Sequence, residues 1–251
     1  MIVDRRHVMH TGLAATASLL VTQSLAVGAP RYKAMAFDAF PIFDPRPIGI
    51  LAETLFPGKG VELINLWRIR QFEYTWLRTV ANAYVDFMRV TEDGLVYATK
   101  SLQLELLDGQ REQLLKAYLS LKAWPDAGPA LQKLRSAGVR LAFLSNFTPA
   151  MLHGSIKAAA LDGLFEHVLS TDQARTYKPA AKAYQLGVSA LGLPLEQILF
   201  VAFGGWDAAG AKMFGYPTFW VNRLGQPAEE LGARPDGEGR TLEDLLSFAG
   251  V

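Results

Sequence analysis

The 251-residue sequence is half hydrophobic and one-fifth charged, a composition that is typical of a globular protein rather than a disordered one. The formal net charge of +1 provides no basic surface for nucleic acid or for an anionic membrane. No cysteine is present, which excludes disulfides, thiol nucleophiles and cysteine metal sites, and only four histidines argue against a histidine triad or a zinc site.

The beginning of the chain differs from the rest. Arg5 and Arg6 precede an uncharged stretch at 11–29, which is rich in Ala and Leu and contains a small-residue cleavage pattern at 24–26. This layout predicts that residues 1–29 are a signal peptide of the twin-arginine type and that the mature protein is periplasmic or secreted. An uncleaved membrane anchor and an N-terminal core helix are the alternatives.

A carboxylate ends the first predicted strand. The apolar run at 34–37 stops at Asp38, and Pro41 and Pro45 then prevent any regular continuation. Open α/β folds bind ligands at the carboxyl edge of the sheet, so Asp38 is a candidate functional acid. An aspartate that merely caps the following segment is the structural alternative.

Helical patterns alone occupy the next part of the chain. Residues 61–80 place apolar side chains on one broad face, Thr91 is a candidate N-cap for a helix over 92–106, and another helix covers 110–121. A helical insertion directly after the first strand predicts a cap domain, residues 48–121, above the edge of the sheet.

Strands and helices then alternate to the end of the chain, as they do around a parallel sheet. The predicted strands cover residues 139–144, 167–169, 198–201 and 218–221. The predicted helices cover residues 129–137, 149–159, 179–191 and 207–214, with a closing helix from residue 241. The expected fold class is therefore α/β, with a Rossmann-like, doubly wound parallel sheet core at 30–47 and 122–251.

Several segments occur in the order found in a known group of enzymes. They are the strand end at Asp38, the strand end at Ser145 and Asn146, the Tyr-Lys-Pro at 177–179, and the segment 200–207 with Asp207. This order resembles the haloacid dehalogenase superfamily. Residues 67–78 resemble the cap helix of its type II members, the L-2-haloacid dehalogenases, and the resemblance covers about residues 33–250.

The resemblance implies that Asp38 is the nucleophile, which displaces halide from carbon and forms an ester that water then hydrolyses. Magnesium phosphatases of the superfamily carry a second aspartate two residues later, where this chain has Phe40. The missing carboxylate disfavours phosphoryl transfer, so we expect neither a metal nor another cofactor.

The resemblance also assigns roles to polar residues around the nucleophile. Arg68 would grip the departing halide together with Asn146, while Ser145 would hold the substrate carboxylate or the nucleophile. Lys178 would neutralise charge near Asp38, and Asp207 would hold this lysine and position the hydrolytic water. For single residues, structural alternatives remain: a solvated helix arginine at 68, a turn at 145–146, or a helix N-cap at 207.

Four further residues complete the candidate site. Tyr184 matches a family tyrosine near the substrate carboxylate, and Phe72, Phe87 and Trp206 would line an apolar pocket together with Phe40. Aromatic residues at such spacing are otherwise common in a core.

Three positions depart from the family pattern, which usually has Thr at 42, Ser at 202 and Asn at 204. This chain has Ile42, Ala202 and Gly204, and the loss of such polar contacts can cost roughly 10²-fold in rate. The resemblance implies a dehalogenase that converts short (S)-2-haloalkanoic acids to (R)-2-hydroxyacids and forms a homodimer, and the predicted signal peptide adds that the enzyme is exported. The departures leave open a divergent hydrolase with another substrate, such as a phosphatase, or a non-catalytic binding protein.

Overall fold

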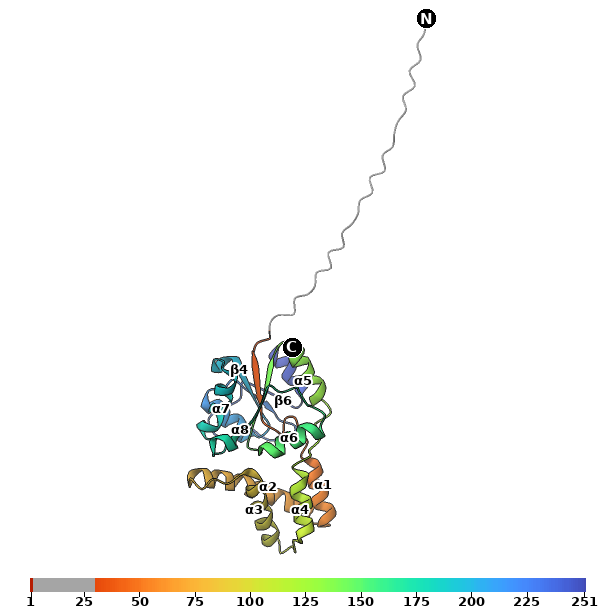
Figure 1. Ribbon diagram of the computed structural model, residues 1–251, viewed down its shortest axis with the longest axis vertical. Helices are drawn as coiled ribbons and strands as arrows, with labels where there is room; N and C mark the ends of the chain where they lie inside the picture. The colour runs from red at the N-terminus through yellow and green to blue at the C-terminus, as the bar shows by residue number, and fades with distance from the viewer. Residues whose placement is uncertain (2–29) are drawn as a thin grey trace.

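The computed structural model describes Met1 and residues 30–251, so the predicted signal peptide, apart from Met1, lies outside the described residues. Six parallel strands form one sheet in the order β3-β2-β1-β4-β5-β6, which confirms the predicted α/β class (Figure 1). The strands are β1 (Ala34–Phe37), β2 (Arg140–Ser145), β3 (His167–Ser170), β4 (Ile198–Ala202), β5 (Thr218–Val221) and β6 (Gly237–Gly239).

The first strand lies where the strand order reverses. The chain runs outward from β1 through β2 to β3 and then returns to β4 on the other side of β1. Residues Ala34 to Phe37 pair in parallel register with both neighbours, and the N–H of Asp38 donates to the carbonyl of Val201 at 3.0 Å. Since ligands of doubly wound sheets bind at this switch point, Asp38 occupies the position that the fold favours for a site.

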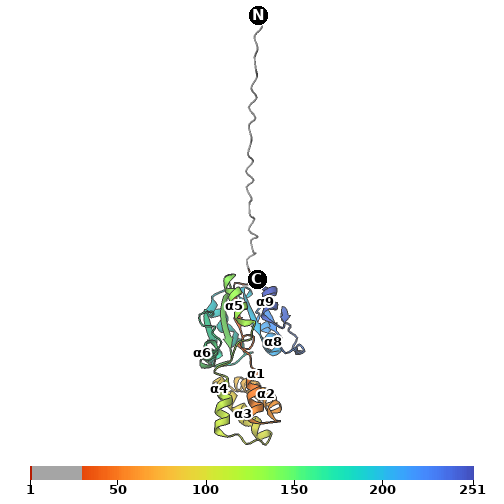
Figure 2. The same ribbon diagram turned by 90° about the vertical axis from the view of Figure 1, so that its right-hand side faces the viewer.

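Helices cover both faces of the sheet, because alternate strand residues point to opposite sides. One face packs against α7 (Ala181–Leu191) and α8 (Gly205–Phe214). The other face packs against α5 (Ala127–Ser136), α6 (Pro149–Ala158) and α9 (Leu242–Ala249) (Figure 2). Two short 3₁₀ helices, η1 (Thr171–Ala174) and η2 (Leu195–Gln197), precede α7 and β4.

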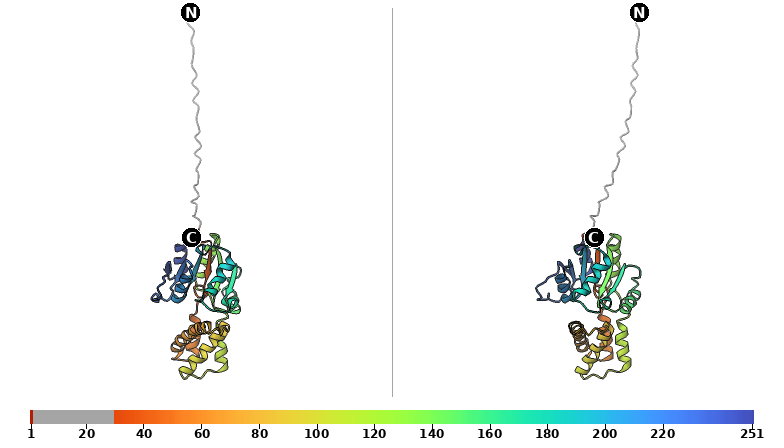
Figure 3. Two further views of the ribbon diagram at one scale, coloured as in Figure 1. Left: turned by 90° about the vertical axis from the view of Figure 1, so that its left-hand side faces the viewer. Right: turned by 60° about the vertical axis from the view of Figure 1, so that its left-hand side comes forward.

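Four helices form a separate layer at the carboxyl edge of the sheet, and all three views in Figures 1 and 3 keep it distinct from the core. They are α1 (Arg46–Leu55), α2 (Gly60–Val80), α3 (Phe87–Ser101) and α4 (Asp108–Ala117). The chain enters and leaves this layer side by side, because Phe43 and Ala123 form an antiparallel bridge. Within the described part of the chain, no helix is long and apolar enough to cross a membrane.

The predicted start of α3 is wrong. The helix begins at Phe87, and Asp86 caps it by accepting a hydrogen bond from the N–H of Arg89 at 2.9 Å. Thr91 instead lies buried inside the helix, where its hydroxyl donates to the Phe87 carbonyl at 2.6 Å and accepts from Gln71 of α2 at 2.7 Å. In the sequence, a threonine whose hydroxyl forms hydrogen bonds inside a helix and to a neighbouring helix cannot be distinguished from an N-cap threonine.

Candidate active site

A cavity of about 890 Å³ lies between the carboxyl edge of the sheet and helix α2. The residues proposed from sequence converge on it, although their positions span most of the chain. Nine of them line the cavity: Asp38, Phe40, Arg68, Phe72, Phe87, Ser145, Asn146, Trp206 and Asp207. The other two, Lys178 and Tyr184, are fully buried and reach the lining residues through hydrogen bonds.

A buried lysine joins the two acids. The ammonium of Lys178 lies 2.8 Å from Oδ1 of Asp38 and 2.6 Å from Oδ2 of Asp207. Burial alone would lower the pKa of Lys178, but the two carboxylates outweigh it and raise the pKa above its usual value. Lys178 therefore keeps its positive charge between the two acids, with the ring of Phe200 5.1 Å from its nitrogen.

Asp207 lies inside the first turn of α8 and does not cap it, since the helix begins at Gly205 and Gly204 is the N-cap. Burial and the charge of Asp38 raise the pKa of Asp207 to about 6, although Lys178 and Tyr184 act in the opposite direction. Asp207 can therefore change protonation state near neutral pH, as a group that activates water must do.

Tyr184 lies behind Asp207, away from the cavity. Its hydroxyl donates to Oδ1 of Asp207 at 2.7 Å, and burial raises the pKa of Tyr184 well above its usual value. The hydroxyl therefore stays protonated and serves as a fixed donor to this carboxylate. The resemblance implied that Tyr184 lies beside the substrate carboxylate, whereas in the structure Asp207 separates it from the cavity.

The two oxygens of Asp38 have different surroundings. Oδ1 accepts hydrogen bonds from Lys178 at 2.8 Å and from the Ser145 hydroxyl at 3.3 Å. Oδ2 accepts a single long bond among the described residues, from the N–H of Phe40 at 3.3 Å. Oδ2 is therefore the oxygen with more electron density available for attack on a bound molecule.

The side-chain amide of Asn146 is held in one orientation. Its Oδ1 accepts from the backbone N–H of Lys178 at 3.0 Å and from the hydroxyl of Thr171 at 3.3 Å. Its Nδ2 is buried and has no hydrogen-bond partner among the described residues, although Asn146 lines the cavity. A buried donor without a partner is costly, so this amide is suited to an anionic ligand. Sequence reasoning missed Thr171, since nothing in the motif identifies it.

Arg68 supplies a positive charge from the cap. It follows Trp67, which is buried in α2 and donates from Nε1 to the Thr91 carbonyl at 2.7 Å. Nearby Arg70 and Arg78 form ion pairs with Glu73 and Asp93, as solvated helix arginines often do. Among the described residues, no aspartate or glutamate pairs with Arg68, which leaves its guanidinium available to an anion in the cavity.

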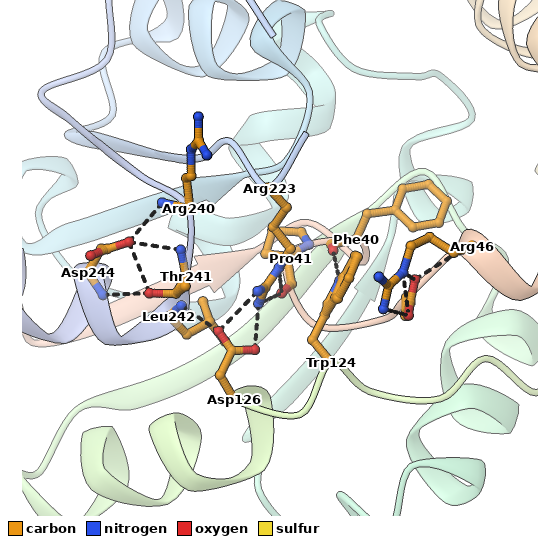
Figure 4. A network of polar contacts seen from close by, with 11 residues as sticks. Phe40, Pro41, Arg46, Trp124, Asp126, Arg223, Arg240, Thr241, Leu242 and Asp244 are labelled. Atoms are coloured by element: carbon orange, nitrogen blue, oxygen red, sulfur yellow. Dashed lines mark hydrogen bonds and ion pairs between the residues drawn. The ribbon is translucent and has the colours of Figure 1, made fainter. Parts of the chain in front are cut away.

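A network of hydrogen bonds and ion pairs holds the backbone of the loop that follows Asp38 (Figure 4). Arg223 donates to the carbonyl of Pro41 at 2.8 Å and forms a bidentate pair with Asp126. Trp124 donates from Nε1 to the carbonyl of Phe40 at 3.0 Å. The network escaped sequence reasoning because Pro41 and Arg223 are 182 positions apart.

The three positions that depart from the family pattern carry no side-chain polar group toward this site. Ile42 and Ala202 are fully buried. At Gly204, an added Cβ would lie 2.8 Å from Nε1 of Trp206, so the indole occupies the space that a larger residue would need. The site therefore contains the charged groups Asp38, Lys178 and Asp207, but it lacks the hydroxyl and amide side chains that are usual at 42, 202 and 204.

Comparisons with known proteins agree with this geometry. The sequence model of the haloacid dehalogenase-like hydrolase family matches residues 22–215. The (S)-2-haloacid dehalogenase of Pseudomonas sp. strain YL is 41% identical over 217 residues, which cover 86% of this chain and 94% of the relative. The haloacetate dehalogenase H-2 of Moraxella sp. strain B is 40% identical, with 88% of this chain and 99% of the relative covered.

Solved structures give the same result. The crystal structure of an L-2-haloacid dehalogenase superposes with a TM-score of 0.86 at 44% identity, and covers 88% of this chain and 99% of its own. The L-2-haloacid dehalogenase of Xanthobacter autotrophicus with covalently bound chloropropionic acid gives 0.80 at 33% identity, covering 86% and 98%. The chain belongs to the haloacid dehalogenase-like hydrolase family.

Proposed function

We propose that this protein is a hydrolytic dehalogenase that converts (S)-2-haloacids and water to (R)-2-hydroxyacids and halide. The observation that carries the proposal is the arrangement around one cavity of a carboxylate, Asp38, and two anion donors, Arg68 and the Nδ2 of Asn146. The carboxylate can attack carbon, while the donors can stabilise the halide that leaves.

In the first step, Oδ2 of Asp38 forms a bond to C2 of the haloacid. The carbon–halogen bond breaks on the opposite side and its electron pair leaves with the halide, so the configuration at C2 inverts. Arg68 and Asn146 stabilise the charge that develops on the leaving halogen. Lys178 remains hydrogen-bonded to Oδ1 of the new ester.

In the second step, water attacks the carbonyl carbon of the ester, the bond between this carbon and Oδ2 breaks, and the hydroxyacid leaves with its C2–O bond intact. Asp207 accepts the proton of this water, for which its carboxylate must be ionised, and the proton then passes to the oxygen of the leaving hydroxyacid. Lys178 lies 2.8 Å from Oδ1 of Asp38 and can stabilise the oxyanion that forms there. Both charged groups of this step are present, but the hydroxyl and amide side chains usual at 42, 202 and 204 are not.

Halide release from (S)-2-chloropropionate tests the proposal. Asp38→Asn should abolish release while the far-ultraviolet circular dichroism stays unchanged, because an amide cannot form the ester. Mass spectrometry of enzyme quenched during turnover should show an adduct on Asp38. Substantial turnover by a protein verified to carry Asp38→Asn would contradict the mechanism, and no release by the wild type would favour a binding protein.

Export is a separate part of the proposal, supported by the pattern that follows Arg5 and Arg6. Residues 1–30 fused to a folded reporter should carry it out of a bacterial cytoplasm, and replacement of both arginines by lysine should block export. A reporter that stays in the cytoplasm would remove this part of the proposal and leave the chemistry untouched.

Self-association is also a proposal. Two large apolar side chains near the end of α2, Leu77 and Val80, are exposed and do not line the cavity. Two copies could cover part of this surface by packing their cap helices together. Sedimentation equilibrium should give twice the chain mass, and a monomer at micromolar concentration would contradict the dimer.

A further inference from the structure

The cavity is much larger than a three-carbon acid requires. Its volume of about 890 Å³ falls in the range of roughly 300–1,000 Å³ that accommodates drug-sized ligands. Besides the proposed reacting groups Asp38, Arg68 and Asn146, the lining includes further residues of α2, Trp206 and residues of the segment 222–229. If the haloacid binds as proposed, the remaining volume accommodates the substituent on C2.

Aromatic rings from two elements line this remaining part. Phe72 of α2 lies 5.2 Å, between ring centroids, from Trp206 of α8, and Trp76 of α2 lies 5.6 Å from the same indole. Trp76 lines the cavity and is 36% exposed, so part of its surface is accessible to a ligand. Flat apolar groups pack well against such rings.

The segment 222–229 contributes another part of the lining and is held by its own hydrogen bonds. Asn222 donates to the carbonyl of Gln226 at 2.8 Å and accepts from the N–H of Gln226 at the same distance. Leu224, Pro227 and Ala228 contribute apolar surface to the cavity. This segment is therefore held in place and adds apolar surface to the lining.

The charges of the lining exclude a second acidic group on the substrate. Among the described residues that line the cavity, Arg68 is the one cationic side chain, and the proposed reaction already uses it. Glu73 and Glu229 also belong to this lining, and Arg70 pairs with Glu73 at 2.7 Å, whereas no cation pairs with Glu229 among the described residues. A carboxylate on the C2 substituent would find no free cation there and would be repelled by Glu229.

We infer that the site takes 2-haloacids with a neutral aromatic C2 substituent, which packs against Phe72, Trp76 and Trp206. This inference rests on the proposed dehalogenase function and goes beyond it by naming the substrate class. The substrate carboxylate and halogen face the polar groups, and the aromatic ring occupies the apolar part of the cavity.

Three bromoacids test the inference by halide release: (S)-2-bromo-3-phenylpropanoate, (S)-2-bromopropionate and 2-bromosuccinate. The arylated acid should have the highest kcat/KM, at least tenfold above bromopropionate, and the dicarboxylate the lowest. Trp76→Ala should reduce the ratio of the first two values by about tenfold. Val61→Ala is the matched control, because Val61 is an exposed apolar residue of α2 that does not line the cavity, and it should leave the ratio unchanged.

A binding measurement separates the inference from the function on which it rests. Calorimetry on the Asp38→Asn protein should show 3-phenylpropanoate binding at least tenfold more tightly than propionate, with the preference lost in the additional Trp76→Ala variant. Aryl-selective binding without any halide release would support the inferred pocket and contradict the dehalogenase function. Equal affinity for the two acids, or halide release with no aryl preference, would overturn the inference.

Discussion

The hydroxyl of Tyr184 offers a sharp test of how the site controls Asp207. Tyr184→Phe removes the donor that lies 2.7 Å from Oδ1 of Asp207 and changes no group that lines the cavity. The hydrogen bond favours the ionised form of Asp207 and so holds its pKa down, against the burial that raises it to about 6. Its removal should therefore raise the pKa further.

The size of the shift follows from the energy of the bond. A hydrogen bond to a charged group is worth about 1.5–3 kcal/mol, and one pKa unit corresponds to about 1.4 kcal/mol, so the pKa should rise by roughly one to two units. In the proposed mechanism, ionised Asp207 accepts the proton of the water, so the acidic limb of the rate profile should move from about pH 6 to roughly pH 7–8. At pH 7, kcat should fall by roughly two- to tenfold.

Halide release measured from pH 5 to pH 9 checks this prediction. Tyr216→Phe is the matched control, since it removes a buried tyrosine hydroxyl from the same aromatic cluster, one that donates to the Tyr184 carbonyl at 3.0 Å and not to Asp207. Its acidic limb should remain near pH 6. If Tyr184→Phe instead raises KM and leaves the limb in place, the hydroxyl acts on the substrate carboxylate and our reasoning is refuted.

Three further predictions concern the metal, the apolar replacements and the polar network. EDTA should leave halide release unchanged, because the described residues contain no group of three or more His, Asp or Glu side chains arranged to hold a metal. Magnesium-dependent hydrolysis of p-nitrophenyl phosphate would favour a phosphatase instead. The double variant Ile42→Thr with Ala202→Ser should accelerate ester hydrolysis and diminish the adduct seen by mass spectrometry. Gly204→Asn should not accelerate ester hydrolysis, since its Cβ would lie 2.8 Å from Nε1 of Trp206. Arg223→Lys should lower the free energy of unfolding by about 1–3 kcal/mol in urea titrations and should reduce kcat, because lysine cannot make the bidentate pair with Asp126. An unchanged kcat would show that the network only stabilises the fold.

The sheet was predictable because its strands are short apolar runs that alternate with helices, and the charged groups were predictable because they stand at strand ends. The strand β6 was missed, since Gly237–Gly239 has no apolar residue to identify it. The cap of α3 was misplaced because Asp86 and Thr91 are both good N-cap residues, and only packing against α2 distinguishes them.

The sequence predicts which residues form the site better than it predicts how their side chains are oriented. A motif position identifies Tyr184, but only the packing of α7 against α8 decides that its hydroxyl meets Asp207 rather than the cavity. In the same way, the free Nδ2 of Asn146 depends on a backbone N–H and a hydroxyl that come from other segments. Side-chain direction is a property of the assembled core, which sequence periodicity does not report.

The antiparallel bridge between Phe43 and Ala123 has a consequence for how such enzymes diverge. The two ends of the cap insertion meet there, with the N–H of Asp44 2.8 Å from the Lys122 carbonyl. A segment whose ends are adjacent can be lengthened, shortened or exchanged without separating the strands that flank it. Asp38, Lys178 and Asp207, which we propose make and hydrolyse the ester, belong to the core, whereas Arg68, Phe72 and Trp76 belong to the insertion. Recombination at this one bridge could therefore give the same chemistry a new range of substrates.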